Sequence, residues 1–360
     1  MESVKHRPIV APFAWRGADI DTTTDWLRPF NPDELAELDA ALQGVKRRGL
    51  AVFDITRDDF PLPGFAPALA KIARELETGR GMIMLRGLPL KYSPDDLCMV
   101  YWGIGAHLGT AVSQGGSGEL LGVVEDVGME VENTKRRGSK TAGELPFHGD
   151  RSDVVGLLCV RKARAGGLSR IVSAAAIHNE ILRRRPDLID IFYADWYNSR
   201  QGDEAPGEAR AYPKPIFGFR DGHFTGMFSP VYIRYAQEFP EVPRLTPAQQ
   251  EALELFGVLA DELALDMAFE PGDIQLLNNH LIYHARTRYE DHAEKEKKRL
   301  LLRLWLAVPG SRPLPKGYEL LFGSIDAGAV RGGVPCREGW RDVTQLRARK
   351  LRAVAGPGPN

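Results

Sequence analysis

The sequence predicts a mainly β protein, a sandwich or barrel with flanking helices. Three observations support this prediction. Short apolar segments typical of strands recur from residue 82 onward, only a few helical segments separate them, and strands and helices do not alternate regularly as they do in a doubly wound sheet. Because all-β units with helical additions reach a length of 360 residues, we expect a single catalytic domain over residues 1–360.

Capping residues, turn residues and apolar segments predict the positions of individual helices and strands. Asn31 precedes a proline and two acids, which predicts a capped helix that ends at Gly49, and Ser93 begins a second helix that ends near Gly109. Asp221-Gly222 predicts the turn of a hairpin within 215–228. Further strands are expected at 82–87, 120–127, 154–160, 273–278 and 299–308, and further helices at 174–193 and 247–265.

These elements suggest three parts of the chain. Residues 1–80 are expected to be a helical and extended addition, and a core follows at about 81–310. The irregular segments 128–144 and 196–235 are interpreted as insertions that form lids over a site. A Gly- and Pro-rich tail from about 340 to 360 is expected to be flexible.

Composition excludes several classes of function. The 47 basic and 48 acidic residues give a net charge of -1, so no nucleic-acid or membrane-surface partner is indicated. Cys98, Cys159 and Cys336 have no metal-ligand spacing and form no evident disulfide framework, which favours a reducing cytoplasm. No signal-peptide pattern and no long apolar span is found, so we expect a soluble cytoplasmic protein; a homo-oligomer is compatible with the sequence.

A His-x-acid pair, which can supply two metal ligands, occurs three times. The copies are His148-Gly149-Asp150, His178-Asn179-Glu180 and His292-Ala293-Glu294. His178 lies in a helical segment, where residues two apart point to nearly opposite sides, so we interpret it as an ordinary helix surface. His292 lies in a charged run typical of a solvated loop. His148 precedes an apolar strand, and an extended backbone places His148 and Asp150 on one face; a capping or loop pair is the alternative.

His284 is the expected third ligand. Two histidines and one carboxylate leave three positions of an iron ion open for a co-substrate and dioxygen, as in non-heme Fe(II) oxygenases. His280 and His284 also have the spacing of a helical zinc pair. The preceding residues, PGDIQLLNN, predict a turn and a strand, and no glutamate beside His280 provides a base, so the zinc interpretation is weaker.

Arg299 and Arg303 lie four residues apart on an expected strand and therefore share a face. A buried arginine needs a partner, and a bound dicarboxylate supplies one with bidentate geometry. The alternative is a structural salt bridge with one of the 48 acids of the chain.

Four ordered segments, FHGD, GGLS, PGDIQLLNNHLIYHARTRYED and KRLLLRLWL, resemble the taurine dioxygenase-like branch of the Fe(II)/2-oxoglutarate-dependent dioxygenases, which includes clavaminate synthase. The resemblance covers residues 80 to 310 and implies a double-stranded β-helix, the jelly-roll or cupin-like core, with flanking helices. It further implies three groups of site residues. His148, Asp150 and His284 hold iron, Arg299 and Ser169 hold the distal carboxylate of 2-oxoglutarate, and Arg303 lies beside the co-substrate and points toward the substrate.

Two features of the sequence limit the choice of substrate and of reaction type. The stretch that holds the sulfonate of taurine in the resembled enzyme is replaced here by Thr110-Ala111-Val112-Ser113, which argues against taurine. Asp150 is retained, whereas related halogenases replace this carboxylate with a small residue. The substrate is expected to contact Ser113, Gln114, Phe228, Tyr232 and Arg303, with Tyr197, Arg200 and Tyr235 as further candidates.

The sequence thus predicts an Fe(II)- and 2-oxoglutarate-dependent oxygenase that uses O2 to oxidise an unactivated C–H bond, releasing succinate and CO2. Hydroxylation is the expected outcome, with desaturation and cyclisation as variants. A small carboxylate-bearing or amino-acid-like molecule is the expected substrate. The alternative is a metal-dependent hydrolase or isomerase on the same barrel that does not use O2.

Overall fold

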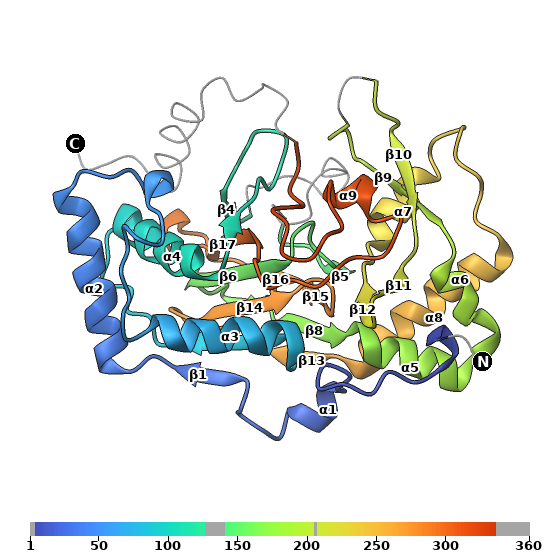
Figure 1. Cartoon of the computed structure of the whole chain (residues 1–360), viewed down its shortest axis with the longest axis horizontal. Coiled ribbons are helices and arrows are strands. Elements are labelled where there is room, and N and C mark those ends of the chain that lie inside the picture. The colour runs from blue at the N-terminus through green and yellow to red at the C-terminus, as the bar shows by residue number, and fades with distance from the viewer. Residues whose placement is uncertain (1–3, 127–140, 205–206, 336–360) are drawn as a thin grey trace.

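The computed structural model describes residues 4–126, 141–204 and 207–335, which form two facing sheets flanked by helices (Figure 1). The larger sheet has the strand order β1-β2-β14-β6-β17-β3, and β4 also pairs with β17. The smaller sheet has the order β13-β8-β15-β5. This arrangement confirms the predicted jelly-roll core with flanking helices.

The larger sheet contains β1 (Leu27–Pro29), β2 (Met82–Arg86), β3 (Thr110–Ala111), β4 (Leu121–Val124), β6 (Val154–Arg161), β14 (Ile274–Asn278) and β17 (Leu300–Ala307). The smaller sheet contains β5 (Leu145–His148), β8 (Ser169–Ser173), β13 (Leu265–Met267) and β15 (Ile282–Arg286). Three separate strand pairs are formed by β7 (Ala165–Gly166) with β16 (Tyr289–Glu290), β9 (Trp196–Ser199) with β10 (Ala211–Lys214), and β11 (Phe217–Arg220) with β12 (His223–Gly226).

The helices are α1 (Gly17–Ile20), α2 (Pro32–Arg47), α3 (Ala66–Thr78), α4 (Pro94–Leu108), α5 (Ala174–Arg184), α6 (Ile189–Tyr193), α7 (Pro230–Ala236), α8 (Pro247–Leu263) and α9 (Glu319–Phe322). In Figure 1, α2 and α4 lie at one side of the sheets, and α5, α6 and α8 lie at the other. None of the helices in the described part of the chain is long and apolar enough to cross a membrane.

Two hydrophobic clusters hold these layers together. In one, α2, α3 and α4 pack against apolar residues of the larger sheet, such as Leu85 and Leu276. In the other, residues of both sheets pack with α5, α6 and α8. Because β1 pairs in parallel with β2, residues before 80 are built into the larger sheet. The expected N-terminal addition is therefore joined to the core by backbone hydrogen bonds as well as by apolar contacts.

Most of the expected elements are present. Asn31 and Glu34 form a reciprocal capping box at the start of α2. Asp221 and Gly222, with φ of 51° and 80°, form the two-residue turn between β11 and β12. Positive φ at both central residues is typical of the hairpin turn that the Asp-Gly pair predicts.

Several elements differ from the expectations or were not individually expected. The helix expected over 174–193 is divided into α5 and α6 by a short 3-10 turn that begins at Pro186, because proline cannot continue the hydrogen bonding of a helix. Helix α3 was not separately predicted within residues 1–80. Strand β15, which carries His284, was also not predicted as a strand of its own.

The two expected lid segments have different outcomes. Residues 127–140, most of the segment 128–144, lie outside the described residues, as does the expected tail at 340–360. The segment 196–235 contains β9 to β12 and the first part of α7, with 205–206 outside the described residues. This second segment therefore contains two hairpins, of which β9–β10 contributes side chains to the site.

Candidate active site

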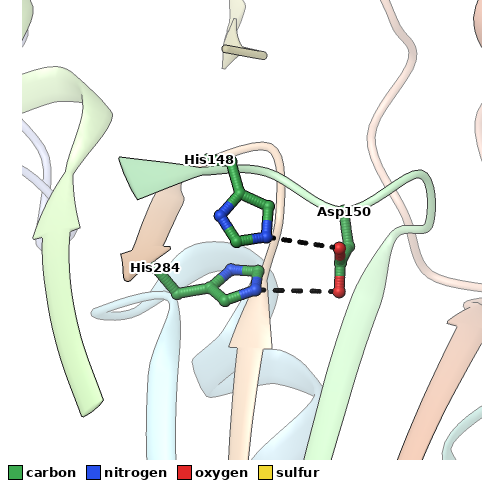
Figure 2. Close-up of side chains that lie close together, drawn as sticks. All are labelled: His148, Asp150 and His284. Atoms are coloured by element: carbon green, nitrogen blue, oxygen red, sulfur yellow. Dashed lines mark ion pairs between the residues drawn. The ribbon is translucent and has the colours of Figure 1, made fainter. Parts of the chain in front are cut away.

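His148 and His284 face each other across two neighbouring strands of the smaller sheet. His148 is the last residue of β5, and the antiparallel register with β15 places His284 directly opposite it. The centroids of the two imidazole rings lie 4.3 Å apart. Asp150 follows β5 by two residues; its Oδ1 lies 3.7 Å from Nε2 of His148, and its Oδ2 lies 3.7 Å from Nε2 of His284 (Figure 2).

This group can hold a metal ion. One potential ligand atom from each of His148, Asp150 and His284 lies within 4.8 Å of the others, and it is the only such group of three His, Cys, Asp or Glu residues within the described ranges. Nδ1 of His148 lies 2.9 Å from the carbonyl oxygen of Pro146, which can only accept a hydrogen bond. The proton therefore resides on Nδ1, and the lone pair of Nε2 is directed to the carboxylate side.

The electrostatics favour neutral imidazole and ionised carboxylate. Burial is the largest cause that lowers the pKa of His284 to about 3, so its ring is neutral at ordinary pH. Burial acts to raise the pKa of Asp150, but the charge of Arg303, followed by further contributions that include the hydrogen bond from Trp305, lowers it below its usual value. The indole of Trp305 donates to the Asp150 carboxylate at 2.7 Å. These are the protonation states that a divalent cation requires.

Gly149, between His148 and Asp150, is favoured by close packing. A Cβ atom at this position would lie 2.9 Å from Sδ of Met227 and 3.2 Å from the carbonyl oxygen of Asn279. The backbone N–H of Asp150 donates to the side chain of Asn279. Gly149 therefore lets the chain pass close to both residues while Asn279 fixes the turn that carries Asp150.

The competing histidine pairs do not join this group. His178 is wholly buried among the rings of Tyr193, Phe217 and Phe224, so the prediction of an ordinary helix surface is wrong for this side chain. The helix turns this face into the core, where apolar neighbours cover it. His292 lies in the loop after β16, as predicted. His280 is also buried and lies 2.8 Å from Asp153, away from the metal group.

A small cavity lies on one side of the group formed by His148, Asp150 and His284. It is lined by His284, Ser169, Arg286, Arg299 and Arg303, together with apolar residues. Arg299 is only 5% exposed, and its Nη1 has no hydrogen-bond partner among the described residues. The hydroxyl of Ser169 lies 3.0 Å from the side-chain oxygen of Gln275. Arg299 and Ser169 thus line the same buried space, in which Arg299 has an unpaired donor while the hydroxyl of Ser169 donates to Gln275.

Arg286 is a residue of this cavity that the sequence analysis did not single out. It lies two residues after His284 on β15 and directly opposite Ser169 on β8. Its Nη2 donates to the carbonyls of Thr141 and Gly143, but Nε and Nη1 are buried without a partner. Burial and the charge of Arg299 lower its pKa to about 10. Residues two apart on a strand share a face, and this spacing from His284 is the signal that could have identified Arg286.

A much larger cavity, of about 430 Å³, lies on the other side of the ligands. His148 and Asp150 belong to its wall, and so do Gln114, Phe228 and Tyr232, three of the predicted substrate contacts. Arg200 and Tyr235 also line it. Ser113 and Tyr197 line neither this cavity nor the smaller one. Ser113 instead donates a hydrogen bond to the carbonyl of Gly115.

Arg303 borders both cavities. Its Nε donates to the side-chain oxygen of Gln114 at 2.7 Å, and its Nη1 lies 3.5 Å from the carboxylate of Asp150. The guanidinium also lies over the ring of Trp305, at 4.9 Å from its centroid. Arg303 is thus fixed by neighbours on three sides and stands between the two spaces.

Comparison with known proteins agrees with this geometry. Residues 46–305 match the sequence profile described as "Taurine catabolism dioxygenase TauD, TfdA family". FR-33289 synthase of Streptomyces rubellomurinus is 33% identical over 327 residues, which cover 88% of this chain and 95% of that protein. Taurine hydroxylase-like protein SAT17 of Stachybotrys chartarum is 30% identical over 330 residues, covering 86% and 83% of the two chains.

The fold also resembles a solved oxygenase. The structure of asparagine oxygenase in complex with Fe(II), hydroxyasparagine and succinate superposes with a TM-score of 0.62 and 16% sequence identity. The match covers 78% of this chain and 93% of that one. At this identity the likeness concerns the fold, and it agrees with the two-sheet core described above.

Proposed function

Because the chain belongs to the taurine catabolism dioxygenase (TauD, TfdA) family, we propose that it is an Fe(II)- and 2-oxoglutarate-dependent oxygenase that oxidises an unactivated C–H bond of a small molecule. The reaction would consume O2 and release succinate and CO2. The solved complex of asparagine oxygenase, which contains Fe(II) and succinate, supports this choice of metal and co-substrate.

The main support for the proposal is that the three proposed metal ligands line two different cavities. His284 lines the small cavity with two buried arginines, whereas His148 and Asp150 line the large one. Fe(II) at this position, with 2-oxoglutarate, would supply the activation of dioxygen. The protein would hold the co-substrate on one side of the metal and the substrate on the other. A hydrolase would have no need of a second, arginine-lined space.

On the co-substrate side, Arg299 and Arg286 are assigned to the distal carboxylate of 2-oxoglutarate. Their unpaired N–H groups are the donors that a carboxylate accepts, and Ser169 lies across from Arg286 to provide a hydroxyl. Both guanidinium groups lie over the ring of Tyr289, at 4.8 Å and 5.1 Å, which limits their rotation. The charge of the co-substrate would relieve the mutual repulsion of the two arginines.

On the substrate side, the large cavity combines aromatic and cationic side chains. Phe228 and Tyr232 provide apolar contact, and Arg303 provides a positive charge next to the metal ligands. A small molecule that bears an acidic group, such as a carboxylate, fits this lining. The chain's own task is to hold one C–H bond of that molecule toward the metal and to exclude water.

Anaerobic addition of Fe(II) and then 2-oxoglutarate tests the proposal directly. Chelation of the metal by the co-substrate gives a weak visible charge-transfer absorption, and we expect this band to appear only when both are present. Absence of the band in the wild-type protein at saturating Fe(II) and 2-oxoglutarate would contradict the proposed function.

Variants of the arginine pair test the assignment of the small cavity. We expect Arg299→Leu and Arg286→Leu each to weaken 2-oxoglutarate binding about 10- to 100-fold, the size of a lost hydrogen bond to a charged group, without weakening Fe(II) binding. Arg288→Leu removes an exposed arginine of the same strand region and is the matched control. Equal 2-oxoglutarate affinity in all three variants would show that the carboxylate binds elsewhere.

A further inference from the structure

The chain after the last core strand packs against the turn that carries Asp150. We call residues 308–335 the supporting segment; it follows β17, lies beyond the residues 46–305 that match the family, and is the red chain around α9 in Figure 1. We propose that this segment holds the Asp150 turn in place and that Arg331 is a positioning residue for Asp150. The inference rests on the proposed function, because Asp150 is a ligand of the proposed metal.

The turn, residues 149–153, is fixed to the core by Asn279. The side-chain oxygen of Asn279 accepts from the backbone N–H of Asp150 at 3.1 Å, and its amide donates to the carbonyl and the hydroxyl of Ser152 at 3.1 Å and 3.0 Å. The backbone N–H of Asn279 donates to the carbonyl of Asp153 at 3.0 Å. Asn279 is wholly buried and directly follows β14. These bonds join the turn to a strand of the larger sheet.

A second set of contacts to the turn comes from the supporting segment. The backbone N–H of Gly333 donates to the carbonyl of Arg151 at 2.7 Å, and Nε of Arg151 donates to the carbonyl of Leu321. The next backbone N–H, of Val334, donates to the carbonyl of Ser113 at 2.8 Å. Arg151 directly follows Asp150, so the supporting segment is bonded to the residue next to the proposed ligand.

Arg331 adds an ion pair to these backbone contacts. Its Nε lies 2.8 Å from Oδ1 of Asp153, at the end of the turn. Its other nitrogens donate within the supporting segment, to the carbonyls of Asp326 and Arg312 and to the hydroxyl of Ser311. Arg331 is only 2% exposed. Charged hydrogen bonds of a buried guanidinium are strong and fix the geometry of their partners.

Asp153 also has partners at the ends of two core strands. Its Oδ1 lies 2.8 Å from Nε2 of His280, and its Oδ2 accepts from the backbone N–H of Val308 at 3.0 Å. Val308 directly follows β17, and His280 lies two residues before β15, the strand of His284. Asp153 thus joins the turn to both strands, and Arg331 joins it to the supporting segment.

The supporting segment is itself held in a defined shape. The backbone N–H of Leu314 donates to the carbonyl of Ile325 at 2.8 Å, and that of Gly328 donates to the carbonyl of Ser311 at 3.0 Å. Arg220, at the end of β11, donates to the carbonyl of Ile325 at 2.7 Å. The segment therefore forms a closed loop that is fixed from outside before it reaches the Asp150 turn.

Asp150 depends on this support more than the other two proposed ligands do. His148 and His284 lie opposite each other on paired strands, whose register fixes both. Asp150 lies in a turn, where the hydrogen bonds of neighbouring residues fix the backbone. Leu321 and Val334 of the supporting segment also line the large cavity, so the same residues bound the space assigned to the substrate. Loss of the support should therefore displace Asp150 more than the histidines.

Titration of the metal-free protein with Co(II) tests the inference. Co(II) binds nitrogen and oxygen ligands of this kind somewhat more tightly than Fe(II) does, and its visible absorption reports on their geometry. We expect Arg331→Met to weaken Co(II) binding about tenfold and to alter the absorption of bound Co(II), as removal of a residue that supports a metal ligand does. Wild-type affinity and absorption in Arg331→Met would overturn the inference.

Arg220→Met is the matched control, because Arg220 contacts the supporting segment at Ile325 and makes no hydrogen bond or ion pair to the turn among the described residues. It should keep the wild-type Co(II) affinity, although it also removes an arginine from the segment. An equal loss of Co(II) affinity in Arg220→Met and Arg331→Met would reduce the role of Arg331 to general stability and would overturn its assignment as a positioning residue.

A pair of glycines tests the same contact if Arg331→Met does not fold. Gly332 and Gly328 have φ of 80° and 68°, and a Cβ atom would lie 2.6 Å from the carbonyl oxygen of Arg151 and 2.4 Å from that of Pro309, respectively. Gly332→Ala therefore presses on the turn, whereas Gly328→Ala places a similar strain inside the supporting segment. We expect only Gly332→Ala to weaken Co(II) binding, by about tenfold. Equal affinities in the two variants would contradict the inference.

The outcomes separate this inference from the proposed function, which the charge-transfer band with Fe(II) and 2-oxoglutarate tests. A wild-type protein without the band, but with weaker Co(II) binding in Arg331→Met and Gly332→Ala, would lose the proposed function and keep the support of the metal site. A wild-type protein with the band, whose two variants bind Co(II) as tightly as it does, would keep the function and lose the support.

Discussion

The two cavities on either side of the proposed metal ligands are built in different ways. The small cavity takes Ser169 and Arg286 from paired strands of the smaller sheet, and Arg299 immediately precedes β17. The large cavity takes many of its residues from turns and from the segment after residue 195, including β10 and α7. The first is therefore set by strand register, and the second depends on how irregular segments pack over the core.

This difference indicates which part of the site is general and which is particular to this chain. Strand register is shared by proteins of the same fold, so a cavity built from it suits a co-substrate common to a family. Side chains on hairpins and turns can change without disturbing the sheets. The large cavity is thus where the identity of the substrate would be determined.

The largest expected effect comes from the metal ligands, since they divide the two cavities. Asp150→Ala should weaken Fe(II) binding more than about 100-fold, because even residues that only support a metal ligand contribute 10- to 100-fold. Trp305→Phe removes the hydrogen bond to Asp150 but keeps an aromatic ring below Arg303, and its effect should fall within that smaller range. Titration of the metal-free protein with Fe(II) measures both. Wild-type Fe(II) affinity in Asp150→Ala would show that Asp150 does not bind the metal. The metal would then not separate the two cavities.

An intermediate effect is expected for the stability of the protein as pH changes. Burial lowers the pKa of Lys214, which lines the large cavity, from 10.5 to about 7 in the folded protein, so the unfolded chain holds more protons between these values. Wild-type stability should therefore rise as pH increases from 7 toward 10.5, by at most about 5 kcal/mol at about 1.4 kcal/mol per pKa unit.

Lys214→Met should lack this rise. The variant is expected to be more stable than wild type at pH 7, and the advantage should disappear near pH 10.5. Denaturant unfolding of the ligand-free protein at several pH values measures the difference. A parallel pH dependence in both proteins would mean that burial in the large cavity does not lower the pKa of Lys214, which would weaken the contrast between the two cavities.

The contrast between regular strands and irregular segments also explains which features could be predicted from the sequence. His148, Asp150 and His284 were identified before the fold was known because the His-x-acid spacing, the strand context and the resemblance agreed. Apolar periodicity and turn residues likewise predicted α2, α4 and the β11–β12 hairpin. These signals are local, since each depends on neighbours a few residues apart in the chain.

Residues brought together by long-range packing were not identified. Lys214 lies in a short strand whose burial depends on Met227 and Tyr318, far away in the sequence, so no local pattern marks it. His178 was interpreted as part of a helix surface because residues two apart on a helix point to nearly opposite sides, but the hairpin β11–β12 covers its side chain. Ser113 was chosen by alignment with a family segment, and its side chain turns to Gly115 instead.

The smallest expected effect is at Gln114, which holds the arginine that the cavities share. Its side-chain oxygen accepts from Nε of Arg303, and its amide donates to the carbonyls of Arg303 and Leu120. Gln114→Ala removes one hydrogen bond to a charged group but leaves Arg303 beside Asp150 and over Trp305. We expect the affinities for 2-oxoglutarate and for butyrate, a carboxylate probe of the large cavity, each to fall less than about tenfold, and by similar factors. Calorimetric titration of the anaerobic protein with Fe(II) present measures both.

The two affinities are expected to fall by similar factors because Arg303 borders both cavities. A change in its orientation would alter both cavities. Ser113→Ala, at the neighbouring residue that lines neither cavity, should change neither affinity. If Gln114→Ala weakened only butyrate binding, Gln114 would act as a wall of the large cavity alone. The two sides of the metal would then be independent, and Arg303 would be fixed by Asp150 and Trp305 without the help of Gln114.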